Sequence, residues 1–157
     1  MILLNQKKKW RRYDLKGKCY YCNEKLSERT VKKHVKGCSI RKEKIKESIA
    51  SSKKTKSQYI LSIVPQYGSK EYSLYIAIDI DLTLKNLDSF LRNIWLECCG
   101  HLSCFIIDDV NYDSSADEEF ESFTQAETMD FELGQVISVG DKFKYDYDFG
   151  STTSLKL

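Results

Sequence analysis

Four residues near the N-terminus have the types and the spacing of a metal site: Cys19, Cys22, His34 and Cys38. Thiolate and imidazole are the ligands that Zn²⁺ takes in tetrahedral protein sites. Two residues separate the first two cysteines, so one tight turn directs both sulfurs at a single ion. His34 and Cys38 are four residues apart, which places them on one face of a helix. The sequence therefore predicts a Cys-Cys-His-Cys zinc finger with Zn²⁺ as its cofactor.

A redox-active Cys-x-x-Cys pair is the competing interpretation of Cys19 and Cys22. That motif accompanies a strand-helix-strand pattern, which the sequence around CYYC lacks, whereas a His and a Cys at finger spacing do follow. The segment has little apolar material besides Leu26, Val31 and Val35. Metal binding is therefore expected to supply the free energy that folds it.

The hydrophobic pattern predicts the elements that position these ligands. Ser27 is a typical N-cap, and apolar residues recur at helical spacing as far as Ile49. We therefore expect a helix from about Ser27 that breaks near Gly37 and then resumes. Residues 51–57 (SSKKTKS) contain no apolar side chain, which indicates a linker.

Beyond the linker the apolar residues recur with a period of two, which is typical of strands. The stretches with this pattern are 59–63, 72–80, 143–149 and 154–157, while residues 104–107 and 110–112 are expected to form a hairpin that turns at Asp108 and Asp109. A helical stripe of Leu84, Leu87, Leu91, Ile94 and Trp95 interrupts them and ends at Gly100. The predicted fold class is α+β: a small zinc finger, made of a knuckle and a helix, followed by a mixed, largely antiparallel sheet domain with one main packed helix.

Charge divides the chain in the same way. Residues 1–57 hold 19 lysines and arginines against 5 acidic residues, a net charge of +14, whereas residues 58–157 carry a net charge of −12. We predict a basic arm with the zinc finger at 1–50, a linker at 51–57 and an acidic α+β domain at 58–157. The basic arm has the electrostatic character of a surface that binds nucleic-acid phosphates.

Nine basic residues are the candidates for nucleic-acid contacts. They are Lys7, Lys8, Lys9, Arg11, Arg12, Arg29, Lys32, Lys33 and Lys36. Trp10, Tyr20 and Tyr21 offer rings that stack on unpaired bases. The alternative is that the cations only solvate the finger or contact an acidic protein partner, in which case the chain is a pure protein-protein adaptor with a structural zinc.

Two further groups of residues were weighed as chemical sites. Cys98, Cys99, His101 and Cys104 have poor metal spacing and fit buried thiols near a hydrogen-bonded histidine better. The carboxylates that a metal-dependent nuclease would need are Asp79, Asp81, Glu97, Asp108, Asp109, Asp146 and Asp148. Most of them fall in turns or at alternate strand positions, where solvation explains them. We therefore expect no catalytic residues and no enzymatic activity.

The C-terminal part resembles a known family. A helix with Trp95 precedes His101, Leu102 and Phe105, and the aromatic-acidic motif YDFG follows at 147–150. These motifs, over about residues 58–157, resemble the plasmid pRiA4b ORF-three-like family, which also occurs as the passenger protein of an insertion element. The resemblance implies a compact α+β domain, a loose association with mobile DNA and no catalytic residues. Relatives continue past YDFG, so the resemblance implies either an incomplete final sheet or an edge strand supplied by another chain. In the second case a protein partner or a second copy pairs with the open edge.

Composition sets the remaining expectations. Hydrophobic residues make up 41% of the chain, which excludes full-length disorder, and no apolar run approaches the roughly 18 residues of a membrane helix. The N-terminal MILLNQKKKWRR does not have the order of a secretory signal. We therefore expect a cytoplasmic protein without a membrane partner.

Overall fold

The ligand-bearing segment folds as a hairpin followed by two helices in the computed structural model. The structure describes residues 2–4, 16–52, 57–67, 73–96, 99–115 and 126–157. Strands β2 (Lys16–Cys19) and β3 (Lys25–Ser27) pair antiparallel, with Gly17 opposite Leu26. The turn between them contains Asn23 at φ 61°, a left-handed conformation that Asn tolerates better than most residues.

Ser27 ends the hairpin and caps helix α1 (Glu28–Gly37), as predicted. Its backbone N–H donates to Thr30 Oγ1 at 3.0 Å. Helix α2 (Ser39–Ser52) follows after one residue, Cys38, which has ψ 114° and so interrupts the helical path near Gly37, also as predicted. Because α2 extends to Ser52, the first two residues of the predicted linker are helical.

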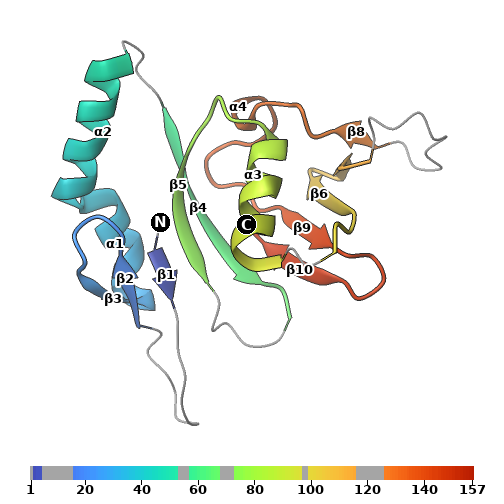
Figure 1. Cartoon of the computed structure of the whole chain (residues 1–157), viewed down its shortest axis with the longest axis horizontal. Helices are drawn as coiled ribbons and strands as arrows, with labels where there is room; N and C mark the ends of the chain where they lie inside the picture. The colour runs from blue at the N-terminus through green and yellow to red at the C-terminus, as the bar shows by residue number, and fades with distance from the viewer. Residues whose placement is uncertain (1, 5–15, 53–56, 68–72, 97–98, 116–125) are drawn as a thin grey trace, which may run out of the picture. The chain divides into compact units, whose positions relative to one another are not determined.

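Three more strands complete this part of the chain. β1 (Ile2–Leu4) pairs antiparallel with both β2 and β5 (Leu74–Asp79), and β4 (Gln58–Pro65) lies on the other side of β5. The strand order is β3-β2-β1-β5-β4. Figure 1 shows α1 beside the β2–β3 hairpin and α2 extending away from it.

The C-terminal part contains a second sheet, ordered β10-β9-β6-β7-β8, in which only the β7–β8 pairing is parallel. Its strands are β6 (Ser103–Ile107), β7 (Val110–Asp113), β8 (Glu127–Thr128), β9 (Lys144–Tyr147) and β10 (Thr153–Lys156). β6 and β7 form the predicted hairpin, because Asp108 and Asp109 both adopt positive φ, as a two-residue turn of this kind requires. A short helix, α4 (Leu133–Val136), precedes β9.

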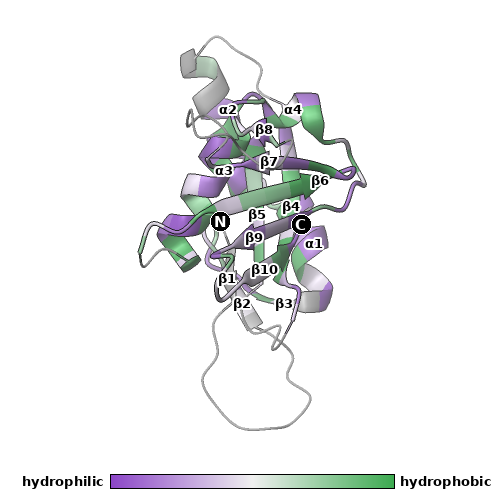
Figure 2. Cartoon of the chain, turned by 90° about the vertical axis from the view of Figure 1, so that its right-hand side faces the viewer, coloured by the Kyte–Doolittle hydropathy of each residue, from purple (hydrophilic) through white to green (hydrophobic). Residues whose placement is uncertain are grey.

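Helix α3 (Leu84–Leu91) covers one face of this sheet (Figure 1). The side chains that are fully buried between helix and sheet are Leu84, Leu87, Leu91, Phe105, Tyr145 and Leu155. Phe105 and Tyr145 are cross-strand partners with ring centroids 4.6 Å apart. Figure 2 shows β6 as a mostly hydrophobic strand within this sheet.

A buried carboxylate ties α3 to the sheet. Asp88 is 7% exposed and accepts hydrogen bonds from the Tyr145 hydroxyl at 2.6 Å and the Ser103 hydroxyl at 2.7 Å. Its other oxygen accepts from Arg92 Nε at 2.8 Å. The charge of Asp88 is thus paired and hydrogen-bonded, which is the condition for burying it.

The predicted helical stripe is confirmed as buried at Leu84, Leu87 and Leu91, whereas Trp95 is half-buried and Ile94 is exposed. Residues Arg92–Leu96 form a π-helix, whose wider turn rotates the following side chains away from the α-helical face. Ile94 is consequently 38% exposed. Gly100, the predicted end of the helix, does adopt φ 71°.

The elements group into two compact units, each described by itself. The first unit comprises residues 1–64 and 68–78, and the second comprises 65–67 and 79–157. β4 and β5 therefore belong to the same compact unit as the four predicted ligands. The predicted domain boundary at residues 51–57, which was based on charge, stays a prediction. No helix among the described residues has the length and apolarity to cross a membrane.

Candidate metal centre

The first unit brings the four predicted ligands together. Cys19 ends β2, Cys22 lies in the hairpin turn, His34 is on α1 and Cys38 is the C-cap of that helix. Their ligand atoms all lie within 4.8 Å of one another. Cys22 Sγ and His34 Nε2 are 3.4 Å apart. In the part of the chain that the structure describes, this is the only group of three or more such residues that could hold a metal ion.

The geometry fits a tetrahedral ion. Bonds of about 2.3 Å to sulfur and about 2.0 Å to nitrogen place tetrahedral ligand atoms about 3.6–3.8 Å apart. The separations here reach at most 4.8 Å, so small side-chain rotations suffice to close the four atoms on one ion. Cys19 is 2% exposed and Cys38 is 5% exposed, whereas Cys22 and His34 are half-buried.

The hairpin turn directs backbone N–H groups at the sulfurs. Burial raises the pKa of the Cys19 thiol, but hydrogen bonds from the backbone N–H of Cys22, the His34 side chain and the N–H of Tyr21 outweigh it and lower the pKa to about 7. The N–H of Glu24 lowers the pKa of Cys22, yet burial and the neighbouring thiols leave it raised overall. Two thiols this close compete for one negative charge, and a cation removes that competition.

A fifth residue, Glu24, supports the histidine from outside. Glu24 Oε2 lies 3.1 Å from His34 Nδ1, while Nε2 of the same ring faces Cys22. This is the arrangement in which a carboxylate holds the Nδ1–H tautomer and leaves Nε2 free to bind metal. The sequence interpretation missed Glu24. The sequence did offer a signal for Glu24. It comes two residues after Cys22, and the tight turn at Cys22 brings the residues that follow it back toward the helix that carries His34.

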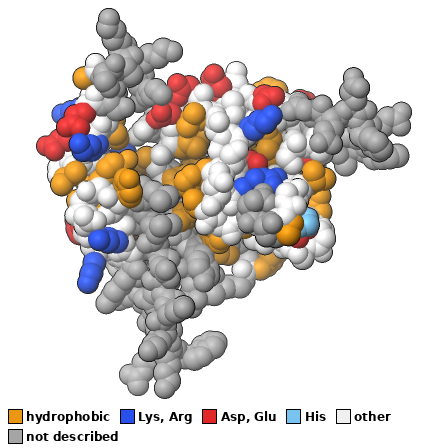
Figure 3. Space-filling model, in the orientation of Figure 1, with side chains coloured by type: hydrophobic (Ala, Val, Ile, Leu, Met, Phe, Trp, Pro, Cys, Tyr) orange, Lys and Arg blue, Asp and Glu red, His pale blue; other side chains and the backbone are white. Residues whose placement is uncertain are grey.

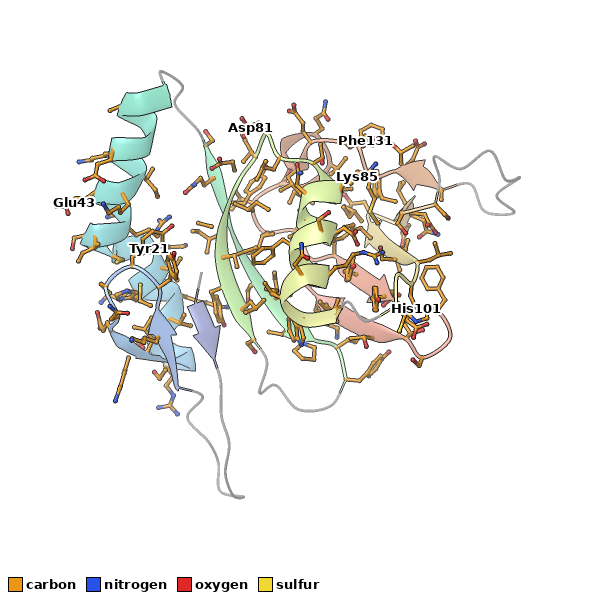
Figure 4. The ribbon with its side chains drawn as sticks, viewed as in Figure 1. Tyr21, Glu43, Asp81, Lys85, His101 and Phe131 are labelled. Carbon is orange, nitrogen blue, oxygen red and sulfur yellow. The ribbon has the colours of Figure 1, made fainter. Side chains whose placement is uncertain are left out.

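The centre rests on a small apolar core. Leu26, Val31 and Val35 are buried beside the two buried cysteines, and Tyr75 of β5 completes the cluster at 5% exposure. Tyr21 packs against the same cluster from the hairpin (Figure 4). Arg41 donates from Nε to the carbonyl of Val35 at 2.9 Å, which satisfies an otherwise open group at the end of α1.

The predicted cationic residues on α1 are all at the surface. Arg29, Lys32, Lys33 and Lys36 are exposed. None of the four makes an ion pair with a residue that the structure describes. The remaining candidates, Lys7, Lys8, Lys9, Arg11 and Arg12, lie outside the described residues, as does Trp10.

The described members of the second cysteine-histidine group, Cys99, His101 and Cys104, do not assemble into a metal site. Cys104 is buried in β6, and burial with the nearby Asp113 raises its pKa to about 11, so it is an unreactive thiol. Cys99 is exposed, contrary to the expectation of a buried thiol. His101 lies instead against Asp148, with Nδ1 and Oδ1 3.5 Å apart (Figure 4). Cys98 lies outside the described residues.

The predicted carboxylates likewise remain separate among the described residues. Asp108 and Asp109 form the hairpin turn of β6 and β7. Asp148 accepts hydrogen bonds from Ser151 Oγ and from the N–H of Gly150, and the Ser151 bond is the main cause of its lowered pKa. Asp79, Asp81 and Asp146 join no potential metal group either, and Glu97 is not described.

The residues of the family motifs meet at one end of the second sheet. His101 contacts Tyr147 edge to face with centroids 6.0 Å apart, and the N–H of Asp148 donates to the carbonyl of Leu102. The HL-x-x-F and YDFG segments are thus adjacent in space although they are distant in sequence. The two short motifs therefore form one contact region of the domain.

Comparison with known proteins identifies the family. A family model described as "Plasmid pRiA4b ORF-3-like protein" matches residues 73–157, more than half of the chain. The match starts later than the predicted resemblance at about residue 58 and does not cover the four ligands. Searches of curated proteins and of solved structures found no match. The chain therefore belongs to the plasmid pRiA4b ORF-3-like family, and it carries a Cys₃His group ahead of the matched region.

Proposed function

We propose that this protein is a zinc-binding, non-enzymatic nucleic-acid-binding protein whose finger contacts phosphates. The observation that carries the proposal is the Cys₃His group itself, with its ligand atoms within 4.8 Å of one another. Cys19, Cys22, His34 and Cys38 would hold the ion. The group would then fix the β2–β3 hairpin against α1 and so present the exposed cations of that helix as one rigid surface.

The donor set favours zinc. Three thiolates and one imidazole in a tetrahedron are a closed set, so no position remains for a reacting water or substrate, and a structural role follows. A hard cation such as Mg²⁺ prefers oxygen ligands. The protein needs reduced cysteines for this role, which agrees with a cytoplasmic location.

The surface around the centre favours a polyanion. Arg29, Lys33 and Lys36 recur at helical spacing on α1, and Lys32 lies beside them. Cations on one face repel each other when no acidic group pairs with them. Bound phosphates would reduce this repulsion, and their binding would also release counterions from the nucleic acid. Direct base contacts are not needed for this kind of binding, so sequence specificity is expected to be low.

A first experiment tests the metal. The purified chain should contain about one zinc per molecule by elemental analysis, and Co²⁺ in its place should give the visible spectrum of a tetrahedral thiolate site. Cys22→Ser should lose both, whereas Cys99→Ser, an exposed cysteine outside the group, should retain both. A zinc-free wild-type protein that binds no Co²⁺ would overturn the metal centre.

A second experiment tests the phosphate contacts. Fluorescence anisotropy with a labelled single-stranded oligonucleotide should show affinity that falls about 100-fold between 50 and 200 mM salt if about five phosphates are neutralised. The double variant Lys32→Ala/Lys33→Ala should bind more weakly with a shallower salt dependence. Lys85→Ala, an exposed lysine of the second unit, serves as the control.

The rival function is a protein-protein adaptor with a structural zinc. An adaptor would retain its zinc but fail to bind oligonucleotides at low salt, so the two experiments together distinguish the functions. A metal-dependent nuclease would cleave the same oligonucleotide in Mg²⁺ or Mn²⁺. Pairing of the chain with a protein partner or a second copy through an open sheet edge stays a prediction.

A further inference from the structure

The outer face of the β2–β3 hairpin has a composition that the packing of the finger does not explain. Strand alternation turns Cys19 and Leu26 toward the core, where each is 2% exposed. Lys18 and Lys25 point the other way and are exposed. Figure 3 shows lysine and arginine side chains over β2 and β3.

These two lysines lie directly opposite each other. The register pairs Lys18 with Lys25 across the two strands. Like charges at directly opposed positions have Cβ atoms only about 5 Å apart and destabilise a strand pair. No ion pair in the described part of the chain relieves the repulsion. A bound anion between the two ammonium groups would relieve it.

An exposed aromatic residue comes two positions after Lys18 in the sequence. Tyr20 follows Cys19 in the turn and is 68% exposed. Its ring contacts Tyr21 edge to face, with centroids 5.5 Å apart and planes at 87°, and Tyr21 is packed against the core. Backbone hydrogen bonds close this turn, from the N–H of Cys19 to the carbonyl of Glu24 at 2.9 Å and from the N–H of Asn23 to the carbonyl of Cys19 at 3.0 Å. The Tyr20 ring therefore projects from a hydrogen-bonded turn that Tyr21 anchors on the core.

We propose that Lys18, Tyr20 and Lys25 form a site for single-stranded nucleic acid, in which a base stacks on Tyr20 and a phosphate binds between the lysines. The inference rests on the proposed function and names the class of nucleic acid. Every base has a stackable face, but in a duplex those faces are covered by neighbouring bases. A protruding ring beside a phosphate site therefore favours an unpaired strand over a duplex.

The experiment compares a labelled 12-nucleotide single strand with the duplex of the same sequence, using the zinc-loaded full chain and fluorescence anisotropy. The unaltered protein should bind the single strand more tightly. Tyr20→Ala should weaken single-strand binding about 5- to 150-fold, the range for loss of one base-aromatic stack. Tyr20→Trp should restore it. Tyr67→Ala removes a tyrosine of similar exposure in the second unit and should have no effect.

A second variant tests the lysine pair without touching the ring. Lys18→Gln/Lys25→Gln should reduce the salt dependence of single-strand binding while leaving the zinc content unchanged, and its thermal stability should rise because the like-charge pair is gone. Zinc content and the Co²⁺ spectrum of each variant confirm that the centre is intact.

The outcomes separate the two proposals. Equal affinity for strand and duplex together with an unaffected Tyr20→Ala variant would overturn the single-strand site and leave phosphate binding by α1 standing. Absence of binding to either form at low salt would overturn the proposed function, and the single-strand site with it. Tighter strand binding that is lost in Tyr20→Ala and regained in Tyr20→Trp supports both.

Discussion

Each of the two compact units is stabilised internally, and the interactions that stabilise the first differ from those that stabilise the second. In the first unit, a few apolar residues surround two buried cysteines, and the hairpin and α1 converge on four ligand atoms. In the second unit, α3 buries leucines against Phe105 and Tyr145, and a paired carboxylate, Asp88, links helix to sheet. A small core needs a cross-link such as a metal, whereas a helix packed on a five-stranded sheet does not.

Removal of the metal should produce the largest difference between the units. Structural zinc binding contributes about 10–16 kcal/mol to the folding of finger-like segments. We expect a chelator, or Cys22→Ser, to abolish amide-exchange protection in β2, β3 and α1. Protection in β6 and β9 should be unchanged, since no metal ligand lies there. Equal loss of protection in both units would show that metal does not act on the first unit alone.

A deletion in the core of the second unit should have the converse effect. Leu87 is fully buried on α3, so Leu87→Ala should cost about 3–5 kcal/mol of unfolding free energy. Metal affinity should be unaffected. Ile94→Ala provides the matched control, because the π-helix leaves Ile94 38% exposed and its loss should cost under about 1 kcal/mol. Urea unfolding measures both, and equal costs would contradict the assigned packing.

The buried carboxylate gives a smaller effect that depends on pH. Tyr145→Phe removes one hydrogen bond to Asp88 and should cost about 1–3 kcal/mol at neutral pH. Burial and the Asp88 bond both raise the pKa of Tyr145 in the folded state. The stability that Tyr145 contributes is therefore complete below pH ~10, where tyrosine of the unfolded chain ionises, and falls at higher pH.

Unfolding curves of the two proteins should converge as the pH rises above about 10. Tyr20→Phe is the control, because Tyr20 is 68% exposed and removal of its hydroxyl should change stability little. A constant difference between wild type and Tyr145→Phe at all pH values would contradict the linkage.

The smallest expected effect tests the role of Glu24 at the metal centre. Glu24→Ala removes the carboxylate that orients His34 and should weaken zinc binding about 10- to 100-fold without loss of stoichiometric binding. Glu47→Ala, an exposed acid of α2 that pairs with Lys44, should leave affinity unchanged. Competition with a chromophoric chelator measures both, and identical affinities for the two variants would remove Glu24 from the centre.

Much of the local structure could be predicted because it depends on neighbouring residues. Ser27 caps α1, the chain breaks after Gly37, and Asp108 with Asp109 turns the β6–β7 hairpin, each for reasons contained in a few adjacent residues. Helical spacing also brought His34 and Cys38 to one face. The predictions failed where the structure depends on residues distant in the sequence. The π-helix at Arg92–Leu96 exposes Ile94, and no short sequence pattern predicted it.

By itself the sequence determined the ligand set, the α+β class and the family, because spacing, periodicity and motif order are properties of the chain. Only the tertiary structure placed Glu24 on His34, completed the core of the finger with Tyr75 from a strand beyond the predicted linker, and set Lys18 opposite Lys25. Those relations depend on which segments pack together and in which register. Packing and register follow from the free energy of the whole fold, which local residue patterns do not specify.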